Sequence, residues 1–196
     1  MSMEPDREKI QKIFREGFLN YTGYTSNEID MKKLEQAPHR KLQPERVSRD
    51  DWENLPMPPD SLELPYTRRF TPAEYRKLSF GLLPVDMDEK WFIFYEGAML
   101  FFHRSWTGEC SFQLRLEPEG EDYLVRETRM NPALNFQEDG YPQKFLDYLI
   151  DRLLLSKAVP FPFPKHIQAP LERALFRHAL VGSSVANDEG GHAADR

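Results

Sequence analysis

One short polar turn contains most of the side chains in this chain that could do chemistry. It runs from His103 to Gly108 with the sequence HRSWTG, directly after an apolar stretch typical of a β-strand. The turn combines an imidazole, a guanidinium, hydroxyls and an indole, which serve in proton transfer, anion binding and ring stacking. Three interpretations are therefore open: a catalytic pair, a ligand-binding site, and a turn that is purely structural.

Catalysis in this turn would use His103 as the base and Ser105 as the nucleophile. Such a pair needs a third group to orient the base and an oxyanion hole, and the strained Gly-x-Ser-x-Gly elbow is absent from the sequence. The sequence therefore predicts no catalytic residue, with His103 and Ser105 as the candidates if there is one. In the structural interpretation, Ser105 and Thr107 satisfy the backbone of the turn and Trp106 closes the edge of the core.

Ligand binding is the functional interpretation that the sequence favours. Arg104 could hold a phosphate or carboxylate through two parallel hydrogen bonds, and Trp106 offers a ring for stacking. Thr107 in the same turn, Arg115 on a following strand and Trp91 on the preceding one complete the predicted ligand-binding set. If these residues converge, they favour a nucleotide-like or otherwise anionic molecule.

The overall composition limits the other function classes. The chain of 196 residues has 26 basic and 32 acidic side chains, a net charge of −6, which disfavours binding to duplex nucleic acid. The single cysteine, Cys110, excludes a multi-cysteine zinc cage, and the histidines other than His103 are scattered, so we expect no metal and no cofactor. The charged N-terminus and the lack of an apolar run of about 18 residues predict a cytoplasmic protein that does not enter a membrane.

The polar turn lies within a predicted run of four strands. A helix is expected to precede the strands, from a cap formed by Thr71 and Glu74 to about Gly81, and a second, with a wide apolar stripe, to follow at about 141–156. This order predicts an α+β fold in which helices flank a four-stranded antiparallel meander. Alternating apolar residues between turn signals place the strands at about 91–95, 98–103, 110–117 and 122–130.

Less regular segments surround this core. In a proline-rich connector, isolated apolar residues such as Trp52 and Leu55 could anchor the chain to the core. The alternating prolines of 159–164 require an extended strap, and Pro170 begins a short helix that ends at about Leu180. The chain thus divides into an N-terminal helix with the connector, an α+β core domain and a disordered tail, at residues 1–65, 66–181 and 182–196.

The positions of the turns decide which side chains share a face of the sheet. Two-residue turns at 96–97 and 107–108 pair His103 with Phe112 and place both on the core side with Phe92. The other face then mixes large apolar and polar side chains and needs a cover. The candidates are the N-terminal helix with the connector, a ligand or partner, or a second copy of the chain. The residues of that face would be Trp91, Ile93, Tyr95, Leu100 and Phe102 beside Ser111, Gln113 and Arg115.

Two runs in this region resemble a poorly characterised family of small bacterial proteins and domains. They are KWFIFYE at 90–96 and LFFHRSWTG at 100–108. The family is associated with proteins of ADP-ribose metabolism, such as ADP-ribosylglycohydrolases and macrodomain hydrolases, in which the pattern looks like an accessory segment. The resemblance implies no catalytic residue, because the acidic metal-binding motifs of the glycohydrolases and the glycine-rich loops of macrodomains are absent here.

Together these patterns predict a non-catalytic binding protein of the bacterial cytosol. It would recognise a nucleotide-like or other anionic ligand, or a protein partner that handles one. The alternatives are a metal-independent hydrolase or transferase that uses His103, and a structural homodimerisation module that uses the face of Trp91 and Phe102. Solvent exposure separates them: burial of His103 and Ser105 opposes catalysis, and a concave cluster at Arg104 favours a ligand.

Overall fold

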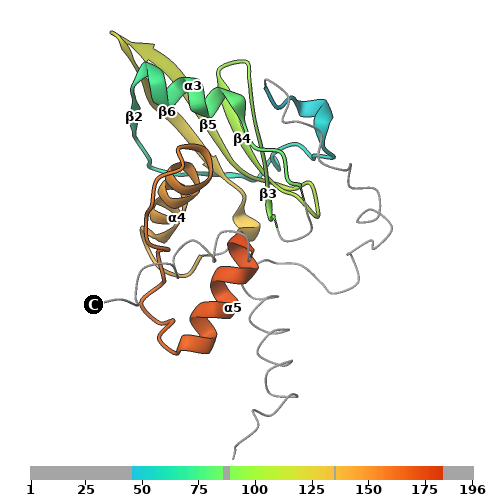
Figure 1. Cartoon of the computed structure of the whole chain (residues 1–196), viewed down its shortest axis with the longest axis vertical. Helices are drawn as coiled ribbons and strands as arrows, with labels where there is room; N and C mark the ends of the chain where they lie inside the picture. Colours follow the sequence, from blue (N-terminus) through green and yellow to red (C-terminus); the bar gives the residue numbers. More distant parts are fainter. Residues whose placement is uncertain (1–45, 86–88, 135, 183–196) are drawn as a thin grey trace, which may run out of the picture.

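The computed structural model describes residues 46–85, 89–134 and 136–182 (Figure 1). The predicted N-terminal helix, the first part of the connector and the predicted tail after residue 182 lie outside the described residues. Within them, the chain has the α+β architecture that the sequence predicts, an antiparallel sheet with helices packed on one face.

The sheet has six strands, not the predicted four. Its four long strands form the meander, and two short strands from the connector pair with the outer edge of β6. Pro65 lies between the two short strands and has no backbone N–H, which prevents one longer strand there. The bounds are β1 (Leu62–Glu63), β2 (Arg69–Phe70), β3 (Trp91–Glu96), β4 (Met99–Arg104), β5 (Cys110–Glu119) and β6 (Asp122–Met130), and the spatial order is β1-β6-β5-β4-β3 with β2 also on β6.

The turn between β3 and β4 lies one residue further along the chain than predicted. Glu96 pairs with Met99, so the turn residues are Gly97 and Ala98, whose φ angles are 57° and 66°. Two successive positive φ angles give the hairpin turn whose twist matches that of the strands. This moves the pairing of β3 with β4 by two positions. Because side chains alternate with a period of two, each side chain of β4 stays on its predicted face of the sheet.

The pairing of β4 with β5 differs from the prediction by one position, which moves the side chains of β5 from Phe112 onward to the opposite face of the sheet. Phe102 pairs with Phe112, and a bulge after Phe102 then pairs His103 with Cys110. Phe112 thus lies on the face of Phe102, whereas the predicted register placed it with His103. A shift of one position moves every following side chain of a strand to the opposite face.

Helices cover the face that carries Trp91 and Phe102, which is the main core of the protein. Trp91 is 2% exposed and Phe102 is 0% exposed, and the Trp91 ring lies 6.0 Å from that of Phe145. Because both side chains are enclosed by the chain itself, they do not form the exposed dimer face considered from the sequence. The helical elements are α3 (Pro72–Phe80), α4 (Tyr141–Leu149), the π-helical turn η3 (Ile150–Leu154) and α5 (Pro170–Val181).

The connector covers the other face, the one that carries Phe92 and Phe94. Val47 is 5% exposed and packs with both phenylalanines, and Trp52 packs against the same cluster as an anchor. From the sequence, the N-terminal helix with the connector was one candidate cover for the face of Trp91. The helices and the connector exchange sheet faces relative to this expectation. The β4–β5 register makes the face of Trp91 the more continuously apolar one, and the helices cover it.

Candidate functional site

Arg104, the predicted anion-binding residue, is bound to the end of α5. Its guanidinium donates to the backbone carbonyls of Leu180 and Ala179 at 2.9 and 3.0 Å, and its central carbon lies 4.9 Å from the Trp91 ring centroid. The last carbonyls of a helix lack partners within the helix, so a cation is stabilising there. Arg104 and Trp91 therefore hold α5 against the sheet.

The other residues of the polar turn also make contacts within the protein. The Ser105 hydroxyl donates to the carbonyl of Glu89 at 2.7 Å, and the Thr107 hydroxyl accepts from a backbone N–H two residues later at 3.3 Å. Trp106 is 36% exposed, and the Lys90 ammonium lies 3.9 Å from its ring centroid. These contacts agree with the structural interpretation of the turn.

Arg115 lies apart from the turn, on the opposite face of the sheet. It pairs with Met99 and shares the face of the connector, whereas Arg104 lies on the helical face with Trp91. Its Nε donates to the Glu127 carboxylate at 3.1 Å. The residues predicted to bind a ligand therefore do not converge on one concave site.

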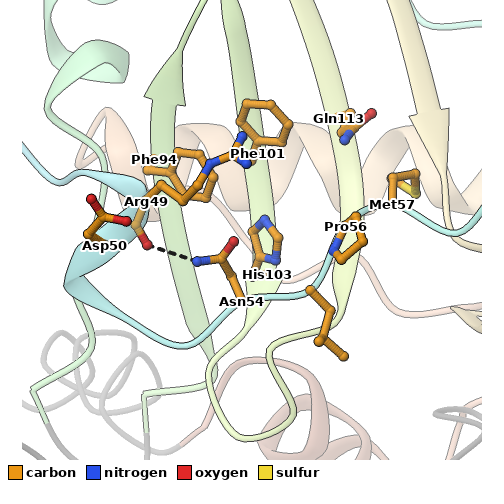
Figure 2. A pocket seen from close by; sticks show the side chains of 10 residues that line it. Arg49, Asp50, Asn54, Pro56, Met57, Phe94, Phe101, His103 and Gln113 are labelled. Atoms are coloured by element: carbon orange, nitrogen blue, oxygen red, sulfur yellow. Dashed lines mark hydrogen bonds between the residues drawn. The ribbon is translucent and has the colours of Figure 1, made fainter.

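A groove of about 450 Å³ lies instead between the connector and the sheet (Figure 2). Small-molecule sites in proteins measure about 300–1,000 Å³. We call it the sheet groove, and its floor comes from β3, β4 and β5. The lining residues are Arg49, Asp50, Asn54, Leu55, Pro56 and Met57 from the connector, and Phe94, Phe101, His103 and Gln113 from the sheet.

Aromatic rings form the floor of the sheet groove. Phe94 and Phe101 stack with their centroids 4.7 Å apart, and the His103 ring stacks on Phe94 at 5.4 Å and 16° from parallel. The guanidinium carbon of Arg49, in the 3-10 turn η1 (Arg49–Asp51), lies 5.6 Å from the Phe94 centroid and 5.7 Å from that of Phe101. The floor is therefore a flat apolar surface, and the cation of Arg49 lies over its two phenylalanine rings.

His103, one of the two catalytic candidates, lies at this floor and is 2% exposed. Its Nδ1 lies 2.8 Å from the carbonyl oxygen of Gly108, and because a carbonyl only accepts, Nδ1 carries the hydrogen. Burial lowers the pKa of the imidazole; the bond to Gly108 opposes this shift, and the charge of Arg49 adds to it. The ring is therefore neutral near pH 7, with Nε2 as an acceptor.

Nε2 of His103 is the exceptional atom of the sheet groove. It is buried and has no hydrogen-bond partner among the residues that the structure describes. Most buried polar atoms are hydrogen-bonded, and an unpaired one costs about 1–3 kcal/mol. A donor from a ligand would remove that cost.

Asn54 adds a second acceptor to the wall of the groove. Its amide nitrogen donates to the carbonyls of Arg49 and Trp52 at 2.8 and 2.9 Å, which uses both of its hydrogens. The amide oxygen remains to accept, and Figure 2 shows it turned toward the space between Arg49 and His103. Two acceptors thus border the same part of the groove.

The groove holds few groups that could react. Ser105, the other catalytic candidate, is 7% exposed with its hydroxyl bonded to Glu89, and it does not line the groove. Within the described ranges, no cluster of histidine, cysteine and acidic side chains could hold a metal ion. Over the same ranges, no helix combines the length and the apolar character needed to cross a bilayer.

Sequence reasoning missed the sheet groove because one wall comes from the connector, which has no periodic pattern. The anchor residue Trp52 indicated that the connector lies on the core, but not on which face. Gly108 is a further indication of where the connector lies, but its meaning is clear only from the structure. Its φ is 72°, and a Cβ there would lie 3.0 Å from the carbonyl oxygen of Glu53, so the connector passes closely over the end of the polar turn.

Known proteins give no guide to the function of this chain, so a functional argument depends on the geometry of the site. No protein-family model matches the chain, and no curated protein or solved structure is significantly similar to it. The association with ADP-ribose metabolism therefore remains an expectation from the sequence.

Proposed function

We propose that this protein acts by binding a small molecule in the sheet groove. The observation that carries the proposal is the buried Nε2 of His103, an acceptor without a partner in the described part of the chain, in a ring that lines a groove of about 450 Å³. Most buried polar atoms have a hydrogen-bond partner, and a donor on a bound molecule would supply one to this nitrogen. The predicted nucleotide-like ligand fits this groove better than it fits the polar turn, where Arg104 is already bound to α5.

The aromatic floor supports a ligand with a flat part. Phe101 presents a partly exposed ring that stacks on the buried ring of Phe94, and Pro56 and Met57 supply apolar surface from the connector side. Pockets for small molecules combine such apolar walls with a few polar groups that fix orientation. In the sheet groove those polar groups are His103, Asn54 and Gln113.

A screen of fragments by two-dimensional NMR on the full chain tests this proposal. We expect flat fragments with an N–H or O–H group to shift the amide signals of β4, β5 and the connector, and to bind several-fold more weakly to His103→Asn. This variant keeps a donor for Gly108 but has no acceptor at the position of Nε2. Arg115→Ala is the matched control, because Arg115 shares this sheet face but does not line the groove. Fragments that bind only elsewhere, or equally to both variants, would contradict the proposal.

A second candidate function is general-base catalysis in the same groove. One observation favours it: the bond from Nδ1 to Gly108 fixes a neutral ring whose Nε2 could take a proton from a bound substrate. His103→Gln separates the two functions, because glutamine can accept a hydrogen bond near the position of Nε2 but cannot act as a base. Binding with retained affinity and no turnover by either protein supports the binding function, whereas turnover that His103→Gln abolishes supports catalysis.

A further inference from the structure

We infer that the ligand of the sheet groove is a nucleobase-type heterocycle that donates N–H hydrogen bonds from its ring edge to His103 and Asn54. This inference rests on the proposed function, since it names the chemical class of the molecule bound in the same groove. It places recognition on the base of a nucleoside, not on a phosphate.

The polarity of the groove selects a donor. Neutral His103 can only accept through Nε2, because its other nitrogen donates to Gly108. Asn54 can only accept through its oxygen, because both of its amide hydrogens are used. A phosphate or carboxylate oxygen is also an acceptor, so at these atoms it would be repelled and would form no hydrogen bond. An exocyclic amine or a ring N–H is complementary to both.

The apolar part of the groove selects a flat ring. Phe94 is 1% exposed and stacks on Phe101, which is partly exposed, so Phe101 offers the ring on which a heterocycle can lie offset, the preferred arrangement of aromatic rings. Stacking of a base on an aromatic side chain tolerates any base, because each has a π-face. The donor pattern, read by His103, Asn54 and the amide of Gln113, would therefore set the preference among bases.

Charge at the groove argues against phosphate as the main determinant. Arg49 is the one cation among the lining residues, and its guanidinium already pairs with Glu96 at 2.9 Å. Asp50, its neighbour, adds a negative charge to the same wall. A nucleoside and its monophosphate should therefore bind with affinities within about threefold of each other.

Binding requires a movement of the connector. Nε2 is covered by the side chains around it, although the ring lines the groove. The backbone of the connector is bonded to the sheet side through the N–H of Leu55, which donates to Gly108 at 2.8 Å. Residues 55–57 would swing outward to admit the edge of the base while Asn54 keeps its bonds to Arg49 and Trp52. The amide of Leu55 should then exchange with solvent at a changed rate on binding.

Calorimetric titration of the full chain with adenosine, cytidine, guanosine and purine riboside tests this inference. Purine riboside is the matched probe, since it keeps the flat purine ring but has no N–H on the base. We expect at least one nucleoside with an exocyclic amine to bind, and purine riboside to bind about tenfold more weakly than adenosine. His103→Gln should retain most of the affinity, His103→Asn should lose about tenfold, and Arg115→Ala should match the wild type.

The outcomes distinguish this inference from the proposed function. The inference is wrong and the proposed function stands in two cases: flat fragments shift the groove signals but no nucleoside binds, or purine riboside binds measurably and as tightly as adenosine. If neither fragments nor nucleosides bind a folded protein at the groove, both are wrong. Affinity that depends on the phosphate and not on His103 would also overturn the inference.

Discussion

Trp91 and Arg104 donate to the same backbone oxygen, the carbonyl of Leu180, at 2.8 and 2.9 Å. The guanidinium carbon of Arg104 also lies 4.9 Å from the Trp91 ring centroid. The two side chains face each other as a cross-strand pair of β3 and β4. They therefore join the sheet to the C-terminal end of α5 by one shared acceptor.

We expect Arg104→Ala to lower the free energy of unfolding by about 2 kcal/mol, because it removes charge-assisted bonds to helix carbonyls and a cation–π contact. Urea unfolding followed by circular dichroism measures the change. Arg115→Ala is the control, since its exposed ion pair should contribute at most about 1 kcal/mol. Equal effects of the two substitutions would contradict the structural role of Arg104.

His103 should make the protein less stable in mild acid. Burial lowers its pKa in the folded state below the ordinary value of 6.5, so the unfolded chain takes up the proton more readily. The stabilisation is full above pH 6.5 and is lost as the pH falls through the folded pKa. Between pH 7.5 and 5.5 this group can account for a loss of up to about 1.4 kcal/mol. Urea unfolding at both pH values should show a smaller pH effect for His103→Asn than for the wild type, and an unchanged effect would contradict this assignment.

Cys110 should be unreactive toward thiol reagents in the folded protein. It is 1% exposed, and burial raises the pKa of its thiol to about 12, so almost no thiolate forms at neutral pH. Labelling with a chromogenic disulfide should proceed only through opening of the fold and accelerate sharply in denaturant. Complete labelling within seconds in native buffer would contradict the burial of this side chain.

Arg68 should be the most important cation for stability near α4. Its guanidinium bridges Asp147 at 2.7 Å and Asp151 at 2.5 Å, and its side chain is 18% exposed. Arg68→Ala leaves two carboxylates without this partner and should cost about 2–3 kcal/mol, below the value for fully buried pairs. Lys144→Ala, which removes an exposed contact to Glu138 at 3.9 Å, is the control and should change little in thermal unfolding. A similar loss from both variants would refute the bridging role.

The sequence predicted the elements whose signals are local. The cap of α3 is an example: the N–H of Glu74 donates to the Thr71 hydroxyl, and the Glu74 carboxylate accepts from the N–H of Thr71, as the residue spacing indicates. The four long strands were found from their alternation. The two short strands were missed, because pairs of residues between prolines carry no recognisable period.

The candidate site could be predicted only in part. His103 was singled out from its residue type, but the sequence placed the binding chemistry on Arg104, whose partner at Leu180 is far away in the chain. The acceptor Asn54 was not identified, since nothing in a connector indicates which surface it lies on. The sheet groove exists only where these distant segments meet.

The sequence by itself determined the four long strand segments, the cap of α3 and the α+β order, because these depend on residues a few positions apart. The tertiary structure alone decided which face of the sheet each side chain joins. A bulge after Phe102 changes the register by one position, and with a side-chain period of two, that single step exchanges the faces of β5. The helices then cover Trp91, and the connector covers the face of His103, which creates the groove.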